Sequence, residues 1–531
     1  MKRRSFIRNA SLFAIAPTFL VACRRGHVYP VSLEGNNSNR GHLIREKFTI
    51  PEELVELQHK IVIVGGGVSG LSAGWALQKA GETDFMVAEL ADQLGGNSVS
   101  GSNAAGKYPW GAHYLPIPNR DYPPLLEFLK EARVVSQDGK ELNSEYLLHE
   151  PMERLYIHGK WQEGLVPSFG LNKNEALEIQ RFFSRMNQFK DAQGNDGKRL
   201  FAVPLEFSSH DPEILQLDQI TFHDWLKEND FESSFLRWYL DYCMRDDYGG
   251  LVNSVSAWAG IHYFASRYGK FENTEESHLL TWPEGNSFLV DSLKKPYLSK
   301  CETGWIARHI EVFKDGFKIY FQNLEQKKNY SVIAQKVILA LPVNVISRIA
   351  KDILPQDWLD KSQYLHSPWM VGNILINSDF FHSINEEVFW DNVMYSGKSL
   401  GYVHTKHQLI QTKMAGKTTF TWYQPLTDDS PSAERKIAHK NSPEDWKRIL
   451  FSELKRMHPE IENYIELIEF KIWGHGIILP IPNLIWGKNQ QQFRKEIIPT
   501  LFFAHADFSG ISIFEQAFYQ GFEAATRTMS A

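Results

Sequence analysis

This sequence has few cysteines, a small net charge and no long apolar runs beyond its N-terminus. Only three of its 531 residues are cysteines, Cys23, Cys243 and Cys301, which are too few for a disulfide framework and lack the spacing of a metal site. The net charge is −6, without the basic footprint of a nucleic-acid-binding protein. Beyond a short run at the N-terminus, no apolar stretch approaches the roughly 20 residues of a membrane-spanning helix. These scarcities argue against a disulfide scaffold, a nucleic-acid partner, a metal centre and a bundle of membrane helices.

The first 23 residues predict an export signal rather than part of the fold. Arg3 and Arg4 precede a short apolar run, residues 10–22, and resemble a twin-arginine signal. The run ends in Leu-Val-Ala before Cys23, which resembles a lipobox with a lipidated cysteine. A plain secretory signal in which Cys23 is accidental stays open as the alternative. Residues 24–55 lack apolar periodicity and predict a flexible tether.

The signal also predicts a location. A twin-arginine route exports folded proteins, which suits an enzyme that acquires its cofactor in the cytoplasm. We therefore expect a protein on the periplasmic side that is held to a membrane by its lipid. Arg24 follows the cysteine, in place of an acidic residue that often retains lipoproteins at the inner membrane, so the outer membrane is preferred.

A glycine-rich turn after residue 64 is the most informative motif. Four β-favouring residues lead into Gly65-x-Gly67-x-x-Gly70, and a helical pattern follows to Lys79. Gly65 permits the tight turn, Gly67 lets the backbone approach a pyrophosphate, and Gly70 allows close packing of helix on strand. The phosphates would lie at the helix N-terminus, next to Ser69. This context predicts a dinucleotide-binding site.

A second predicted strand, residues 84–88, delivers an acid to the same site. It ends at Glu89, 19 residues after Gly70. A carboxylate at this position accepts hydrogen bonds from an adenosine ribose and repels a 2′-phosphate. The ligand is therefore expected to be a dinucleotide without that phosphate.

Two further glycines follow this strand and distinguish FAD from NAD. The segment 91–97, Ala-Asp-Gln-Leu-Gly-Gly-Asn, resembles the second glycine motif of the flavin amine oxidase superfamily. That superfamily includes monoamine and polyamine oxidases, protoporphyrinogen oxidase and phytoene desaturases. The resemblance implies that Gly95, Gly96 and Asn97 lie near the flavin end of FAD. The family usually has arginine where Asn97 stands.

Three more segments resemble the same superfamily in the same order. They are the strand 336–342, the Pro-x-Gly turn in 281–286, and the strand 500–507 with the helix that follows it. The resemblance implies that Asp507 contacts the ribityl or pyrophosphate region. It also implies that the helix N-terminus at Phe514 faces the flavin pyrimidine, where its dipole would stabilise negative charge. Neither Cys243 nor Cys301 occupies a family position for covalent attachment, so FAD is expected to bind noncovalently.

A chain of 531 residues exceeds one hydrophobic core, so at least two domains are expected. The resemblance implies an α/β fold in which a Rossmann-like FAD-binding domain is discontinuous, comprising residues 56–135, 278–345 and 495–531. Residues 136–277 and 346–494 would form a mixed sheet-and-helix, α+β substrate domain. A cluster of aromatic residues predicts a core of packed helices, and some of its members could line an apolar cavity. The cluster comprises Phe235, Trp238, Tyr239, Tyr242, Trp258, Tyr263, Phe264 and Tyr268.

Four residues are predicted to line a cavity over the flavin ring: His113, Tyr114, Asn373 and His475. Each can form hydrogen bonds without a fixed charge. Asn373 stands on a strand where oxidases of the superfamily often carry a lysine. Arg245-Asp246-Asp247 predicts a solvated turn, with attraction of a cationic amine as the alternative.

These features predict an exported FAD-dependent oxidoreductase that oxidises an amine, or a related small molecule, by hydride transfer to flavin N5. Its electron acceptor would be O2 or another oxidant. Two alternatives stay open. One is a dehydrogenase of the desaturase or protoporphyrinogen oxidase type that acts on a hydrophobic substrate, which the absent lysine favours. The other is a lipoprotein that keeps FAD without catalysis.

Overall fold

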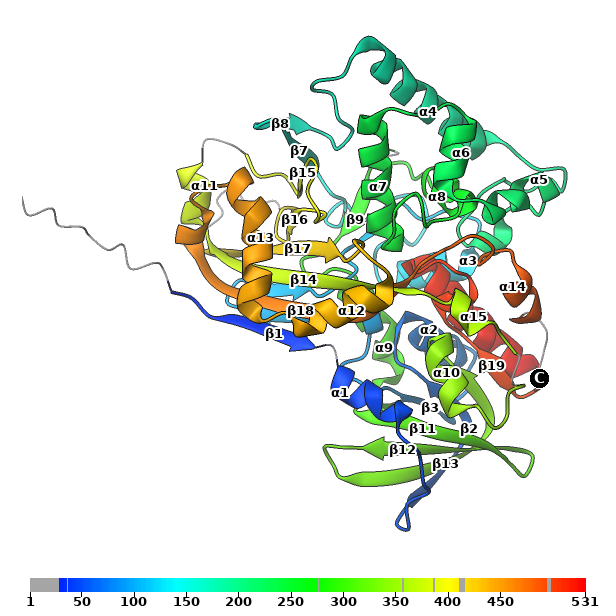
Figure 1. Ribbon diagram of the computed structural model, residues 1–531. Helices are drawn as coiled ribbons and strands as arrows, with labels where there is room; N and C mark the ends of the chain where they lie inside the picture. The colour runs from blue at the N-terminus through cyan, green and yellow to red at the C-terminus, as the bar shows by residue number, and fades with distance from the viewer. Residues whose placement is uncertain are drawn as a thin grey trace, which may run out of the picture.

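Two β-sheets, each covered by helices, form the framework of the computed structural model (Figure 1). The structure describes residues 28–531 apart from 36, 276, 356–357, 385–386, 410–415 and 494–497. The predicted export signal, with Cys23 of the lipobox, lies outside these described residues. Within them, no helix is both long enough and apolar enough to cross a bilayer.

The seven-stranded sheet is mostly parallel and carries the glycine-rich turn. Its strand order is β10-β3-β2-β13-β12-β11, and β19 pairs with the end of β13. The strands are β2 (Val55–Val64), β3 (Phe85–Ala88), β10 (Cys301–Glu302), β11 (Trp305–Phe313), β12 (Gly316–Asn323), β13 (Lys328–Leu339) and β19 (Leu501–Phe503).

Both faces of this sheet are buried, as its apolar strands predict. Because successive side chains of a strand point to opposite faces, Ile61 and Ile63 pack with α2 (Val68–Lys79) and α15 (Phe514–Ser530). The alternate residues, 62 and 64, belong to the opposite core with α10 (Val343–Ile349). This arrangement confirms the predicted α/β class with a Rossmann-like domain.

Two glycines allow the helices on one face to approach closely. A Cβ at Gly70 would lie 1.8 Å from the Gly65 carbonyl oxygen, and a Cβ at Gly521 would lie 1.9 Å from that of Ser69. Both distances are far below van der Waals contact. Residues without side chains therefore let α2 lie against the turn and α15 lie against α2.

The eight-stranded sheet is mixed, in the order β1-β18-β14-β17-β16-β15-β7-β8. α12 (Pro431–Lys440) and α13 (Pro443–Met457) cover one face. A helical layer of α4 (Lys173–Asp191), α6 (Phe222–Glu228), α7 (Ser234–Tyr248) and α8 (Ala257–Ala265) shares the other core (Figure 1). The strands are β1 (Val31–Gly35), β7 (Glu153–Ile157), β8 (Lys160–Glu163), β14 (His366–Asn377), β15 (Asp391–Met394), β16 (Tyr402–His404), β17 (Lys417–Pro425) and β18 (Ile465–Ile478).

Shorter elements connect the two sheets. β6 (Tyr114–Pro116) pairs with β9 (Leu279–Thr281), and the hairpin of β4 (Ser100–Asn103) and β5 (Gly106–Pro109) precedes them. The remaining helices are α1 (Ser38–Gly41), α3 (Pro123–Glu131), α5 (Pro212–Leu215), α9 (Ser287–Lys294), α11 (Asp379–Ser383) and α14 (Lys488–Phe493).

The predicted tether over residues 24–55 does not hold for its described part. β1 pairs in parallel with β18, and α1 with the 3-10 helix His42–Arg45 follows. The predicted start of the second part of the substrate domain, at residue 346, also differs. Buried residues between 346 and 364 pack in the core of the seven-stranded sheet and thus belong with the Rossmann-like domain. We call residues 28–46 the N-terminal arm, since they lead from one sheet to the other.

Candidate functional site

A cavity of about 520 Å³ lies where the parallel strands of the seven-stranded sheet end. In such sheets, ligands bind at the carboxyl ends of the strands. The predicted cofactor residues that line this cavity are Gly65, Gly67, Ser69, Glu89, Gly95, Gly96, Asn97, Asp507 and Phe514. Gly70 lies behind the turn, where its role is the close packing described above.

The glycine-rich turn leaves room that no protein atom fills. Gly65 has φ +109°, and a Cβ there would lie 2.2 Å from the Ala340 carbonyl oxygen. At Gly67 the nearest atom to an added Cβ is 3.9 Å away, so the space beside this residue belongs to the cavity. α2 begins here without a side-chain cap and without an acid in its first turn. Its unpaired amides are therefore open to an anion such as a pyrophosphate.

Glu89 is held at the end of β3 by backbone amides. Its carboxylate accepts hydrogen bonds from the Gly66 N–H at 2.6 Å and the Ala91 N–H at 2.8 Å. Burial raises the pKa of this carboxyl, against the lowering effect of those amides. The fixed carboxylate faces the cavity at the position expected for a ribose-binding acid.

Asp507 lies at the opposite side of the cavity, between two histidines. Its Oδ1 is 2.9 Å from His366 Nε2 and 3.2 Å from His505 Nδ1, and its Oδ2 accepts from the Val343 N–H at 2.9 Å. Burial would raise the pKa of Asp507, but the two histidines outweigh burial and hold it well below its usual range. The carboxylate is therefore ionised and oriented.

The N-terminal arm borders the cofactor cavity. Glu34, Gly35 and Asn37 are among its lining residues. Arg40 of α1 forms ion pairs with Asp92, after the second strand of the sheet, and with Glu325. The arm thus forms part of the cavity wall, and Arg40 joins it to a residue after β3 and to one between β12 and β13.

A second cavity adjoins the first and has two compartments, which we call the chamber. The near compartment, about 170 Å³, shares Asn97, Trp473, Gly476 and Phe514 with the cofactor cavity. The far compartment, about 260 Å³, continues from it. Residues that line both compartments are His113, Tyr114, Pro116, Asp246, Asp247, Arg267 and Tyr423.

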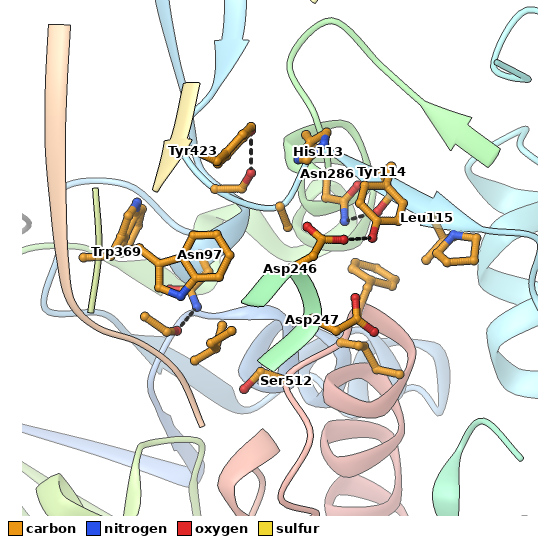
Figure 2. A pocket seen from close by; sticks show the side chains of 18 of the residues that line it. Asn97, His113, Tyr114, Leu115, Asp246, Asp247, Asn286, Trp369, Tyr423 and Ser512 are labelled. Atoms are coloured by element: carbon orange, nitrogen blue, oxygen red, sulfur yellow. Dashed lines mark hydrogen bonds between the residues drawn. The ribbon is translucent and has the colours of Figure 1, made fainter. Parts of the chain in front are cut away.

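His113 and Tyr114 line the chamber (Figure 2). The His113 ring stacks on Tyr423 with centroids 4.7 Å apart, and burial lowers the pKa of its imidazole to about 3. His113 is therefore neutral near pH 7. The Tyr114 hydroxyl donates to Asp246 Oδ2 at 3.1 Å, which orients that carboxylate into the near compartment.

Asp246 and Asp247 are not part of a solvated turn, contrary to the prediction. They occupy the last turn of α7 and line the chamber, while Arg245 turns away and donates to the carbonyl oxygen of Lys398 at 2.7 Å. Burial raises the pKa of both carboxyls, and the charge of Asp246 raises that of Asp247 further. Acids in the last turn oppose the helix dipole. This conflict is the sequence signal that indicates a functional role.

One cation balances part of this negative charge. Arg267 pairs with Glu515 in the first turn of α15, and it is the only arginine or lysine among the described residues that line the chamber. Burial would lower the pKa of Arg267, but Glu515 and Asp247 raise it. Glu515 Oε2 is buried with no hydrogen-bond partner among the described residues. The walls of the chamber therefore carry an excess of carboxylates.

The far compartment combines carboxylates with aromatic rings. Glu153 of β7 and Asp391 of β15 lie on its wall, and the Tyr242 hydroxyl donates to Asp391 Oδ2 at 3.0 Å. Part of the predicted aromatic cluster lines this compartment, whereas Trp258 is fully buried in the helical core. The lining aromatics are Tyr239, Tyr242, Tyr263, Tyr268, Trp390 and Tyr423.

Two of the four predicted chamber residues lie elsewhere. Asn373 is fully buried in β14, where its Nδ2 donates to the Pro109 carbonyl oxygen and its Oδ1 accepts from Thr421. His475 lines the cofactor cavity near His366 instead of the chamber. Burial, with the nearby Arg435, lowers its pKa to about 3. Asn373 therefore has a structural role, and His475 faces the cofactor side.

These features define a class of fold: a Rossmann-like dinucleotide-binding domain joined to a mixed-sheet domain, with a chamber beside the cofactor cavity. The model of the NAD(P)-binding Rossmann-like domain matches residues 63–132. No curated protein sequence matches the chain significantly.

Solved structures share the fold over nearly the whole chain. Putrescine oxidase bound to putrescine is 17% identical, with TM-score 0.64, over 90% of this chain and 100% of that one. Cyclohexylamine oxidase from Brevibacterium oxydans IH-35A is 15% identical, with TM-score 0.64, over 89% and 99%. An oxidoreductase from Methanosarcina mazei is 14% identical, with TM-score 0.55, over 89% and 100%. The chain thus has the same fold as these three proteins.

Proposed function

We propose that this protein is an FAD-dependent oxidoreductase that oxidises an amine. The observation that carries the proposal is the pair of half-buried carboxylates, Asp246 and Asp247, in a chamber that opens onto the cofactor cavity. A buried carboxylate needs a cationic or hydrogen-bonding partner, and a protonated amine supplies both.

The cofactor cavity fits FAD in its chemistry. The space beside Gly67 and the amides of α2 would hold the pyrophosphate, and Glu89 would bind the adenosine ribose. The N-terminus of α15, at Phe514, would face the flavin pyrimidine. FAD supplies the two-electron acceptor of the reaction. No cysteine is among the described residues that line the cavity, which supports noncovalent binding.

The residues of the chamber would prepare the amine. The raised pKa values of Asp246 and Asp247 suit these carboxylates to take a proton from a substrate ammonium. The neutral amine that results has the free lone pair that oxidation at the adjacent carbon requires. Neutral His113, fixed by stacking on Tyr423, would hold the substrate by a hydrogen bond.

The charge of the chamber supports an amine substrate over the two alternatives. A large apolar substrate, as in the desaturase alternative, would leave several carboxylates without partners, at the cost of their desolvation. A cofactor-containing protein without catalysis would not need a chamber of this kind. The reduced cofactor would pass its electrons to O2 or another acceptor.

Export and lipid anchoring are a separate part of the proposal. They rest on Arg3, Arg4 and Cys23 in the sequence. Lysine at both arginine positions should leave the precursor in the cytoplasm. Export of that variant at the normal level would rule out the twin-arginine route, and an unmodified Cys23 thiol would rule out the anchor.

The test of the function begins with the purified holoprotein. Extraction should release FAD at close to one equivalent, without NAD. Anaerobic addition of primary amines should then bleach the visible flavin absorbance. Recovery of NAD alone, or an unchanged spectrum with every amine tried, would overturn the assignment.

A further inference from the structure

We propose that a third cavity, which adjoins the cofactor cavity at Glu89, binds the phosphate group of a second ligand. This cavity has a volume of about 840 Å³ and lies between the N-terminal arm, α10, α12 and β18. Figure 1 shows α1 of the arm, α10 and α12 on the same side of the molecule. We call this space the basic cavity. It shares no described lining residue with the chamber, so its ligand is distinct from the substrate of the proposed reaction.

The first observation is the charge of the wall. Glu89 is the only acid among the described residues that line the basic cavity, and backbone amides already bind its carboxylate. The lysines and arginines of the wall come from three separate segments: Arg45 from the arm, Arg348 from α10, and Arg435, Lys436 and Lys440 from α12. None of these five cations forms an ion pair within the described residues, and Arg435 instead donates to the carbonyl oxygens of His366 at 2.7 Å and Gly474 at 3.3 Å. The cavity therefore has an excess of positive charge.

The second observation is the spacing of the cations on α12. The residues of this helix that line the cavity are 432, 435, 436, 439 and 440, which is the spacing of a single helix face. Lys436 and Lys440 are four residues apart, and like charges at this spacing destabilise a helix. The helix dipole favours cations in the last turn of α12, but it does not explain why Arg45 of the arm lines the same cavity.

The third observation is repulsion across the cavity. Partial burial, with the charge of Arg45, lowers the pKa of both His42 and Arg435. After burial, the charges of Arg435 and Arg45 also lower the pKa of His475. The arm, α12 and β18 thus hold like charges near one another. A bound phosphate would replace this repulsion by charge-assisted hydrogen bonds.

The phosphates of FAD do not account for these cations. Their expected place is beside Gly67 at the N-terminus of α2, and Gly67 does not line the basic cavity. None of the five cations lines the cofactor cavity, where Lys471 is the only lysine or arginine among the described residues. The two cavities meet at Gly65, Glu89 and Pro342, where the adenosine of FAD is expected. The second ligand would therefore bind beyond the adenosine, toward the arm and α12.

The experiment titrates the FAD-bound holoprotein with inorganic phosphate in a calorimeter, at an ionic strength held constant with sodium chloride. We expect saturable binding to a single site. Arg45→Gln and Lys436→Gln change exposed residues of the arm and of α12. Each should weaken phosphate binding by about tenfold, the effect of losing one hydrogen bond from a charged donor. The use of two walls prevents a folding defect in one variant from deciding the result.

Arg456→Gln is the matched control. Arg456 is exposed on α13 and does not line the basic cavity. Its substitution removes the same charge and should leave phosphate binding unchanged. Equal weakening by this variant would show a general effect of net charge and would overturn the site. Phosphate binding to the FAD-free protein but not to the holoprotein would also overturn it, because FAD would then fill the cavity.

Vesicles distinguish the two sources of a phosphate group, a soluble compound and a lipid headgroup. Holoprotein of the Cys23→Ser chain, which offers no thiol for a lipid anchor, is sedimented with phosphatidylglycerol or with phosphatidylcholine vesicles. Sedimentation with phosphatidylglycerol alone, lost in Lys436→Gln, would support the site and identify a lipid headgroup. Binding of inorganic phosphate without sedimentation would support the site and identify a soluble phosphorylated ligand. The absence of both kinds of binding would overturn the proposal.

Discussion

The cofactor cavity and the chamber are built in opposite ways. The cavity is shaped by backbone: glycines, helix N-termini and amides that hold Glu89, most of them within short contiguous motifs. The chamber is shaped by charged and aromatic side chains from elements far apart in the sequence, including β7, α7 and β15. A backbone site binds the same cofactor whatever the substrate, whereas the side chains of the chamber can change independently.

The largest effect is expected from Gly65→Ala. The new Cβ would clash with the Ala340 carbonyl at φ +109°, a cost of several kcal/mol in overpacking and backbone strain. We expect a lower melting temperature and loss of bound FAD. Gly81→Ala is the matched control, because Gly81 also has a positive φ, +84°, but no atom within 4 Å. Equal destabilisation by both changes would show that the contact with Ala340 is unimportant.

Gly67→Ala separates ligand contact from folding. Its Cβ would meet no protein atom closer than 3.9 Å, so the stability of the apoprotein should stay within about 0.5–1 kcal/mol of the unmodified value. Affinity for FAD should nevertheless fall at least about tenfold, because the added methyl occupies the place of the pyrophosphate. Denaturation of apoprotein and titration with FAD measure the two quantities. Unchanged FAD affinity would contradict the position of the pyrophosphate.

In the chamber, Asp246→Asn should lower kcat/KM for an amine by about 100-fold or more, as loss of a proton acceptor does. FAD should remain bound, because the carboxylate lines the chamber and not the cofactor cavity. Stopped-flow measurement of flavin bleaching tests this. A variant that reduces its flavin at the normal rate would remove Asp246 from the proposed chemistry.

The pH dependence of stability tests the effect of placing two acids, Glu153 and Asp391, opposite each other on β7 and β15. The folded-state pKa of Glu153, about 7, lies above its unfolded value, so the folded state binds the proton more tightly. The stabilisation that comes from protonating Glu153 in the folded state is therefore complete below about pH 4.5, and it is lost as the pH rises through 7. Glu153→Gln should stabilise the substrate-free protein by about 1–3 kcal/mol at pH 8, and by little at pH 4.5. A larger stabilisation by Glu153→Gln at pH 4.5 than at pH 8 would contradict the raised pKa of Glu153.

The smallest effect is expected at the N-terminal arm. Arg40→Ala removes two surface ion pairs, with Asp92 and Glu325, which contribute about 0–1 kcal/mol at such sites. Global stability should hardly change, while FAD should dissociate a few-fold faster because the arm opens more often. Arg448→Ala, which removes an exposed pair within α13, should leave dissociation unchanged. Identical rates of FAD dissociation from the two variants would show that the arm does not help to retain the cofactor.

The contrast between the two sites also explains what the sequence could predict. Residues that line the cofactor cavity can be recognised in the sequence because each motif carries its own geometry in a few neighbouring residues, as in Gly65 to Gly70 and Glu89. The chamber depends on long-range packing. Arg245-Asp246-Asp247 has the composition of a solvated turn, and only the opposition of its acids to the helix dipole indicates otherwise.

Two other errors have physical causes. Asn373 was placed from the position of a lysine in related oxidases, and the β14 register turns its side chain toward Thr421 and away from the chamber. β1 has only two apolar residues, Val31 and Leu33, which alternate with polar ones and are partly buried against the core beneath α13, and so short a pattern is not distinctive in the sequence. Its structure comes from the edge of β18, which supplies the hydrogen bonds.

Because β1 pairs with β18, the order in which the chain is synthesised limits when β1 can fold. The first described strand can reach its place only after residues 465–478 have been synthesised and folded into the sheet. Until then, the arm cannot border the cofactor cavity. Asp507 and Phe514 of the same cavity are synthesised later still, so the cavity and the arm beside it are completed together, once the C-terminal segment has folded.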